Sequence, residues 1–209
     1  MKRYKIKEIF YTLQGEGFHA GRPAVFVRFT GCNLWTGREE DRKKAICQFC
    51  DTDFIGTDGQ NGGHYTSLEL TQKIKELWPD ASQPFIVCTG GEPLLQLDQA
   101  LADTLRKNNI YIAVETNGTQ LAPKGIDWIC VSPKAQTTLV LTQGHEMKLV
   151  FPQKGMMPKD VEHLDFDHFF LQPMDGHWIK AHTHESILYC KAHPSWKISV
   201  QLHKILGID

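Results

Sequence analysis

Three of the six cysteines in this 209-residue chain have a spacing that suits a metal centre. Cys47 and Cys50 form a C-x-x-C pair, and Cys32 precedes that pair in the sequence. A C-x-x-C pair on a loop can bind one metal centre together with a third ligand from a preceding strand end. The three thiols suit a four-iron cluster with one iron left open for a substrate, or a structural zinc with His64 as fourth ligand. The spacing alone leaves both open, together with reduced thiols that bind no metal.

The other three cysteines are expected in the core. Cys88 and Cys130 stand inside apolar runs, and Cys190 lies on a predicted helix. A reduced cysteine in such surroundings behaves as a small hydrophobe. Six cysteines in 209 residues are too few for a disulfide scaffold, and a chain of this length can bury a core without one.

Further polar motifs each follow a segment that is predicted to be a strand. They are Gly31-Cys32, Gly90-Gly91-Glu92-Pro93, Thr116-Asn117-Gly118, Pro133-Lys134 and Pro173-Met174-Asp175. Because the carboxyl ends of parallel strands share one edge, we expect these motifs to meet at one site. The paired glycines permit close approach of the backbone to a ligand, or a tight turn in which Pro93 opens a helix.

Strands and helices alternate along the chain and must position these motifs. Strands are predicted at 6–12, 24–30, 85–89, 110–115, 127–132, 146–151, 169–172 and 197–203. Helices are predicted from a capping box at 66–69 to residue 78, over a leucine stripe at 94–105, and at 183–193, with a short turn after Pro158. This alternation predicts parallel strands joined by right-handed crossovers.

The chain is short for a complete eight-unit barrel, for which about 250 residues is typical. We therefore expect an α/β fold: a partial TIM-type barrel of about six βα units forming a single domain over residues 1–209. An open doubly wound sheet is the alternative.

The composition excludes several classes of protein. With 23 basic and 24 acidic residues, the net charge of −1 lacks the strongly basic balance of a chain that binds nucleic acid through phosphates. There is no apolar run of about 18 residues for a membrane span, and the basic start at 1–7 leads into no secretory signal. We expect a cytoplasmic protein that binds neither nucleic acid nor membrane. The charged run at 38–44 is interpreted as a solvated loop or helix.

The cysteine motif, with Phe49 before Cys50, and the Gly90-Gly91-Glu92-Pro93 turn resemble those of radical S-adenosylmethionine (SAM) enzymes. Most members of that superfamily space the cysteines C-x3-C-x2-C, whereas this chain inserts a longer charged segment at 36–46. The longer spacing is similar to that of the 7-carboxy-7-deazaguanine synthases of queuosine biosynthesis, a tRNA modification pathway. The same family is resembled by FYTLQGEG at 10–17, RFTGCNLW at 28–35, CDTD at 50–53, ETNG at 115–118, SPK at 132–134 and QPMD at 172–175. A cluster-binding insertion is expected at 33–64.

The resemblance implies a lyase that converts 6-carboxy-5,6,7,8-tetrahydropterin to 7-carboxy-7-deazaguanine with loss of ammonia. Cys32, Cys47 and Cys50 would hold a [4Fe-4S] cluster whose open iron binds the amino and carboxylate groups of SAM. A 5′-deoxyadenosyl radical would abstract hydrogen from the substrate, whose six-membered ring then contracts. SAM is regenerated and so acts as a cofactor, and no side chain is assigned as a catalytic acid or base. A flavodoxin or ferredoxin would donate the electron, and the chain would form a homodimer.

The resemblance also implies the residues that bind each molecule. Those expected to bind SAM are Phe49, Cys50, Asp51, Gly91, Ser132, Pro133, Lys134, Gln172, Pro173, Met174 and Asp175. Those expected to bind the substrate are Leu13, Gln14, Gly15, Glu16, Arg28, Thr89, Glu115, His203 and the terminal Asp209. Thr52 matches the protein ligand of a magnesium ion, which keeps water and substrate oxygens as its other ligands.

Several of these roles fit the chemistry of the side chain. Arg28 can bind the substrate carboxylate by a bidentate pair. Gln14 or Glu16 can pair with the donor–acceptor edge of a guanine-like ring. His203 is expected at the end of the last strand, where a structural role is the alternative. Two other functions stay open, namely a radical SAM enzyme on another substrate and a zinc-stabilised binding module.

Overall fold

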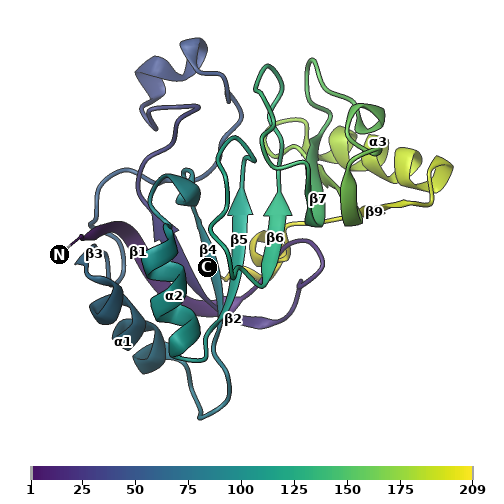
Figure 1. The fold of residues 1–209 in the computed structure, drawn as a ribbon. Helices are drawn as coiled ribbons and strands as arrows, with labels where there is room; N and C mark the ends of the chain where they lie inside the picture. Colours follow the sequence, from purple (N-terminus) through teal and green to yellow (C-terminus); the bar gives the residue numbers. More distant parts are fainter. Residues whose placement is uncertain (1, 209) are drawn as a thin grey trace.

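The computed structural model describes residues 2–208, and nine strands of these residues form one sheet (Figure 1). The strands are β1 Tyr4–Leu13, β2 Pro23–Phe29, β3 Gly63–Tyr65, β4 Phe85–Gly90, β5 Tyr111–Thr116, β6 Trp128–Val131, β7 Gln143–Phe151, β8 Asp165–Pro173 and β9 Trp196–Ile198. The α-helices are α1 Ser67–Leu77, α2 Gln99–Lys107, α3 Ile179–Ala192 and α4 Leu202–Leu206. Three 3-10 helices complete the described elements: η1 Glu39–Lys44, η2 Pro93–Leu95 and η3 Pro158–Asp160.

The sheet is mostly parallel and does not close on itself. Its order is β3-β1-β2-β4-β5-β6-β7-β8-β9, and every neighbouring pair from β2 to β9 is parallel. These pairs require six crossovers, in agreement with the expected partial barrel of about six units. α-Helices α1, α2 and α3 lie on three of the crossovers, and the other three run through loops and η3.

The prediction of uniformly parallel strands is wrong at the N-terminal edge. β1 pairs antiparallel with both β2 and β3. The reason is the connection from β1 to β2 at 14–22, which is shorter than the dozen or so residues that a parallel crossover needs. The three-residue strand β3, in the glycine-rich loop, was not predicted.

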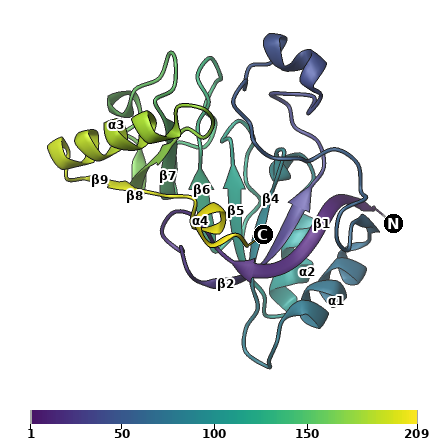
Figure 2. The same ribbon diagram turned by 180° about the vertical axis from the view of Figure 1, so that it is seen from behind.

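The core lies between the sheet and the helices that cover it. α1 and α2 cover one face of the sheet, whereas α4 and the C-terminal end lie on the other face (Figures 1 and 2). Leu70 and Ile74 of α1 pack with Leu101 and Leu105 of α2 in the main hydrophobic cluster. β4 is buried along nearly its whole length, which explains its continuously apolar sequence.

The core assignment of Cys88 and Cys130 is confirmed, since their side chains are almost completely buried. Burial raises the pKa of Cys88 to about 12 and that of Cys130 well above its ordinary value. Cys190 is half-buried and packs against the main core cluster.

Capping side chains decide where the helices begin. The predicted capping box is present: the side chain of Thr66 accepts from Glu69 N (3.2 Å), and Glu69 accepts from Thr66 N (2.7 Å). The leucine stripe at 94–105 was predicted as one helix but forms η2 and then α2. Asp98 starts the second piece because its side chain accepts from Leu101 N (3.0 Å).

Candidate active site

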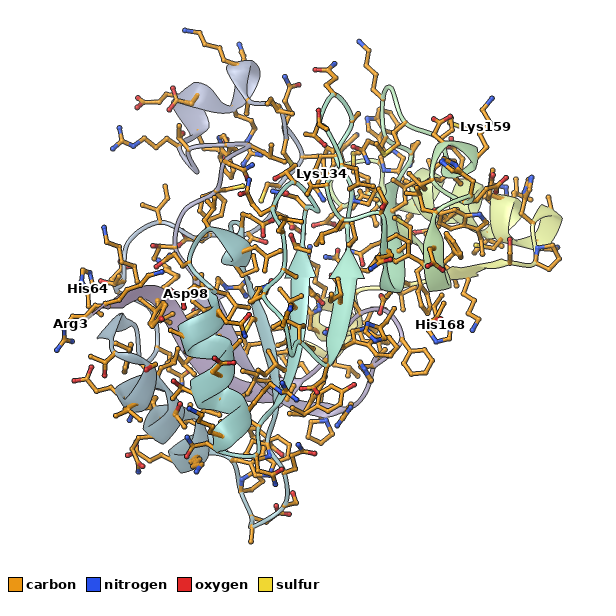
Figure 3. The ribbon with its side chains drawn as sticks, in the orientation of Figure 1. Arg3, His64, Asp98, Lys134, Lys159 and His168 are labelled. Carbon is orange, nitrogen blue, oxygen red and sulfur yellow. The ribbon has the colours of Figure 1, made fainter. Side chains whose placement is uncertain are left out.

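A cavity of about 390 Å³ lies at the carboxyl ends of the parallel strands. Such a volume is typical of small-molecule sites. It is lined by these sequence-predicted residues: Leu13, Gln14, Gly15, Glu16, Arg28, Cys32, Cys47, Phe49, Cys50, Asp51, Thr52, Thr89, Gly91, Glu115, Ser132, Lys134, Gln172, Pro173, Met174, Asp175 and His203. Figure 3 shows Lys134 just beyond the ends of β5 and β6. The strand-end motifs therefore converge as the parallel topology requires.

Two of the predicted site residues are not part of this lining. Pro133 is buried, and its carbonyl accepts from Nε2 of Gln153 (3.3 Å). Asp209 lies outside the described residues.

The three clustered cysteines are free thiols on the wall of the cavity. Burial raises the pKa of Cys32 and of Cys47, so a positive neighbour is needed to favour the thiolate. The half-buried Lys134 is such a neighbour, and its charge opposes the effect of burial at Cys47. Three soft sulfur donors beside a cation fit an iron–sulfur cluster, whose ligands must be thiolates.

The zinc alternative does not fit this geometry. Its proposed fourth ligand, His64, is exposed on β3 and does not line the cavity. Figure 3 shows His64 at the sheet edge, far from Lys134.

The charged run at 38–44 is more than the solvated segment that was predicted. It forms η1, and Arg42 turns inward to donate from Nη1 to the carbonyls of Gln48 and Cys50 (both 3.0 Å). The guanidinium lies over the ring of Trp35, 4.0 Å from its centre, and pairs with Glu39. Arg42 thus fixes the backbone of the C-x-x-C loop.

The paired glycines after β4 bring two strand ends together. A Cβ on Gly91 would lie 2.1 Å from the carbonyl oxygen of Gly31 and 2.9 Å from Cβ of Cys32. A Cβ on Gly90, where φ is +136°, would lie 2.1 Å from Phe29 O. Only glycine permits this approach, so the turn packs directly against the loop that carries the first cysteine.

The floor of the cavity contains a buried lysine that was not predicted. Nζ of Lys148 lies 2.5 Å from Glu16 and 3.3 Å from Glu115, and Gln14 donates to Glu115 (3.0 Å). Burial favours the uncharged forms of Glu16 and Lys148, but the attraction between their charges outweighs burial. The charge of Lys148 lowers the pKa of Glu16, and the charges of Glu16 and Glu115 raise the pKa of Lys148. The lowered pKa keeps Glu16 ionised, and the contacts with Lys148 and Gln14 fix the positions of Glu16 and Glu115.

Replacing Lys148 by methionine should lower the free energy of unfolding by about 3 kcal/mol, because it leaves buried carboxylates without their cation. In the wild type the Glu16–Lys148 contribution is complete above the ordinary Glu16 pKa of 4.5 and is lost as the pH falls toward the lowered value of about 2. Urea unfolding over this range should show a smaller acid dependence in the variant. Lys73→Met, which removes an exposed pair with Glu76, is the control and should change stability little. Equal effects of the two variants would contradict the assignment.

The C-terminal segment covers one side of the cavity. Lys204 of α4 pairs with Asp51 (2.6 Å) and Asp175 (2.5 Å), and Gln201 donates to Glu16 (3.0 Å). Burial alone would raise the pKa of Asp51, but the hydrogen bond and charge of Lys204 lower it. The same lysine lowers the pKa of Asp175. The C-x-x-C loop and the loop after β8 are thereby linked through α4.

His203 lines the cavity but is not at the end of a strand. The strand predicted at 197–203 ends at Ile198, because Leu202 N bonds to Gly15 O (2.9 Å) and the chain then turns into α4. The histidine ring packs on Gly15, where a Cβ would lie 2.3 Å from Nδ1. A side chain at position 15 would clash with His203, so a glycine is needed there for α4 to pack against this loop.

The loop that contains Thr52 is fixed by a buried lysine of β1. Nζ of Lys7 lies 2.9 Å from Asp53 and 2.8 Å from Asp58 and donates to the carbonyl of Ile55 (3.0 Å). This contact holds the residues after Cys50 at the wall of the cavity.

Comparison with known proteins is consistent with this geometry. Residues 42–135 match the Radical SAM superfamily model. The chain is 56% identical over 207 residues to 7-carboxy-7-deazaguanine synthase of Caulobacter vibrioides, covering 98% of this chain and 99% of that protein. The synthase of Bradyrhizobium diazoefficiens is 57% identical with the same coverage. The crystal structure of QueE from Escherichia coli matches 96% of this chain and 95% of its own, with a TM-score of 0.71 at 27% identity.

No helix in residues 2–208 is long and apolar enough to span a membrane.

The cysteine spacing, the partial barrel and the similarity over nearly the whole chain point to the same family. The chain belongs to the 7-carboxy-7-deazaguanine synthase family of radical SAM enzymes.

Proposed function

We propose that this protein converts 6-carboxy-5,6,7,8-tetrahydropterin to 7-carboxy-7-deazaguanine and releases ammonia, as part of queuosine biosynthesis. The names of the full-length relatives support this reaction. The observation that carries the proposal is a single cavity lined by three free thiols, by Arg28, and by the carboxylates of Glu16 and Glu115 with their partner Lys148. The residues assigned to the cofactor and those assigned to the substrate therefore lie next to one another on one lining.

Cys32, Cys47 and Cys50 are assigned to the [4Fe-4S] cluster. With SAM bound, the reduced cluster would supply the one electron that cleaves SAM to methionine and the 5′-deoxyadenosyl radical, which would abstract a hydrogen atom from the substrate. SAM is assigned to the wall formed by Phe49, Asp51, Gly91, Ser132, Lys134 and the residues from Gln172 to Asp175. Lys134 donates to the carbonyl and hydroxyl oxygens of Ser132 (2.6 and 2.8 Å), which fixes this wall.

The substrate is assigned to the opposite wall and the floor. A guanine-like edge presents N–H donors, and the carboxyl oxygens of Glu16 and Glu115 present acceptors. Arg28 donates from Nε to Glu8 (2.7 Å), which sets the orientation of its guanidinium at the cavity. Its terminal nitrogens can then bind the substrate carboxylate as a fork. His203 and Thr89 complete this part of the lining.

Three further assignments rest on the family resemblance. Thr52 contributes its hydroxyl to a magnesium ion whose other ligands are water and substrate oxygens. A flavodoxin or ferredoxin donates the electron, and the protein works as a homodimer. The cytoplasmic location is proposed separately, from the composition and sequence.

The reaction is tested by incubating the anaerobically reconstituted protein with SAM, a reductant, magnesium and the 6-carboxy pterin. We expect one ammonia for each substrate consumed. A tetrahydropterin that lacks the carboxylate is the control and should release little. Cleavage of SAM without release of ammonia from the 6-carboxy pterin would favour a radical SAM enzyme on another substrate.

A further inference from the structure

A second, much smaller cavity lies against the floor of the active site. Its volume is about 10 Å³, which is close to the room that one water molecule requires. Gln14, Glu16 and Glu115 line both cavities. His19 and Glu146 are on the lining of the small cavity alone. Gln14 and Glu16 belong to the connection at 14–22, called the substrate-binding loop below, and with Glu115 of β5 they lie between the two spaces.

Two polar atoms on this lining have no hydrogen-bond partner. Among the described residues, Nε2 of His19 and Oε1 of Glu146 are the buried side-chain nitrogen and oxygen atoms left unpaired. Leaving such atoms unsatisfied is costly, and buried polar groups nearly always have a partner. Two unpaired polar atoms, from residues that line one cavity of this size, indicate a single water that bonds to both.

The other oxygen of Glu146 already has two donors. Its Oε2 accepts from Phe18 N (3.2 Å) and from the indole nitrogen of Trp128 (3.3 Å). Burial raises the pKa of Glu146, and the cation on the same strand, Lys148, is already paired with Glu16 and Glu115. These contacts leave Oε1 as the place for a proton.

The partner histidine is suited to accept. Burial and the charge of Arg22 lower the pKa of His19 to about 4, so its ring is neutral near pH 7. A neutral imidazole can offer one nitrogen as an acceptor, and a water between the two side chains can donate to Nε2.

We propose that Glu146 is an un-ionised carboxylic acid that donates to one buried water shared with His19, and that it positions the substrate-binding loop. The assigned role of that loop rests on the proposed function. The contact is direct: Gly17 has φ +66°, and a Cβ there would lie 1.9 Å from Oε1 of Glu146. Gly17 and Phe18 follow Glu16 in the chain, so Glu146 acts on the active site through the backbone.

The surroundings define the expected pH dependence. The charged and titratable groups around Glu146 are Glu16 and His19 on the loop, Glu115 of β5, Cys130 of β6, Lys148 of β7 and His168 of β8, with Arg22 and His145 near His19. A carboxyl whose pKa is raised by folding destabilises the native state as the pH rises above its ordinary value of 4.5. The free energy of unfolding therefore falls with increasing pH from about 4.5 until the raised pKa of Glu146 is reached.

The test compares Glu146→Gln and Glu146→Ala, with the exposed Glu185→Gln as the control. Infrared difference spectra at neutral pH should show a protonated-carboxyl band in the wild type that disappears in Glu146→Gln and persists in Glu185→Gln. Glu146→Gln should also melt higher than the wild type, by a margin that grows as the pH rises above about 4.5. These two readouts do not depend on the identity of the substrate.

Activity should separate the two variants at Glu146. The glutamine amide can still accept from Phe18 and donate to the water, so kcat/KM should stay within about threefold of the wild type. Glu146→Ala should lose about tenfold or more with the cluster content unchanged. A band that persists in Glu146→Gln, or a loss in that variant equal to that of Glu146→Ala, would overturn the proposal. An inactive wild type would instead contradict the proposed function and leave the spectroscopic and melting results decisive.

Discussion

Replacing Cys47 by alanine is expected to yield a protein that binds little iron and forms no 7-carboxy-7-deazaguanine. Cys47 is buried beside the cavity, and its thiol is one of three donors available to the cluster. Two thiolates cannot hold a cluster that needs three cysteine ligands plus one open iron. Turnover should therefore fall by about a thousandfold or more, because the radical chemistry depends on the cluster. Iron and sulfide analysis, visible absorbance and product assays measure this loss.

Cys190→Ala is the matched control for this experiment. Cys190 is also a free, partly buried cysteine, but it packs against the core in α3 and does not line the cavity. It should retain the iron and sulfide content of the wild type. Retention of the cluster by Cys47→Ala, or its loss in Cys190→Ala, would refute the ligand assignment.

Arg28→Ala is expected to raise KM for the pterin by about a hundredfold, since a bidentate bond between charged groups is lost. Arg28 is mostly buried on β2, lines the cavity, and has its orientation fixed by Glu8. Affinity for SAM should be unchanged because the assigned SAM wall lies on other loops. Steady-state kinetics with varied pterin, combined with equilibrium binding of SAM, separate the two effects.

Arg38→Ala is the control for a lost arginine, since Arg38 is exposed and weakly paired with Glu40 (3.8 Å). It should leave both constants unchanged. Arg28→Lys should recover only part of the affinity, because an ammonium cannot form a planar fork. An equal loss of pterin and SAM affinity in Arg28→Ala would contradict its role as the carboxylate partner.

The sequence predicts most of the cavity lining because the local pattern and the topology agree. Each motif follows an apolar run, and parallel strands bring all carboxyl ends to one edge. The signal is most specific for the spacing of Cys32, Cys47 and Cys50 combined with the LQGEG segment at 13–17. Similar reasoning places Cys88 and Cys130 in the core, since a reduced cysteine in a continuous apolar run behaves as a small hydrophobe.

The side chains that sequence patterns missed are fixed by long-range contacts. Lys148 lies in the middle of a strand and meets Glu16 only in the folded chain. The one local indication that Lys148 has a role is its position two residues after Glu146. Both residues therefore point to the same side of β7, and both are charged residues in a mostly buried strand. Arg42 stands in a run of mixed charges that gives no hint of which residue turns inward. Lys204 follows the segment at 197–203, which was predicted to be a strand, so its position on α4 was not foreseen.

The errors in the fold have equally physical causes. β1 is rich in the residue types of a buried strand, and only the shortness of the following loop shows that it pairs antiparallel with β2. The leucines at 94–105 keep a helical period across η2 and α2, so periodicity alone does not reveal the break. Asp98 marks it, because its side chain caps the second helix.

Product formation under limiting SAM is the measurement that tests the proposed reaction most directly. Reconstituted protein would be supplied with reductant, magnesium, excess 6-carboxytetrahydropterin and less SAM than pterin, and the products followed by mass spectrometry. We predict that 7-carboxy-7-deazaguanine accumulates to more than the amount of SAM added, because SAM is regenerated in each cycle, and that none forms without SAM. Absence of the deazaguanine from protein that holds its cluster and cleaves SAM would contradict the proposed function.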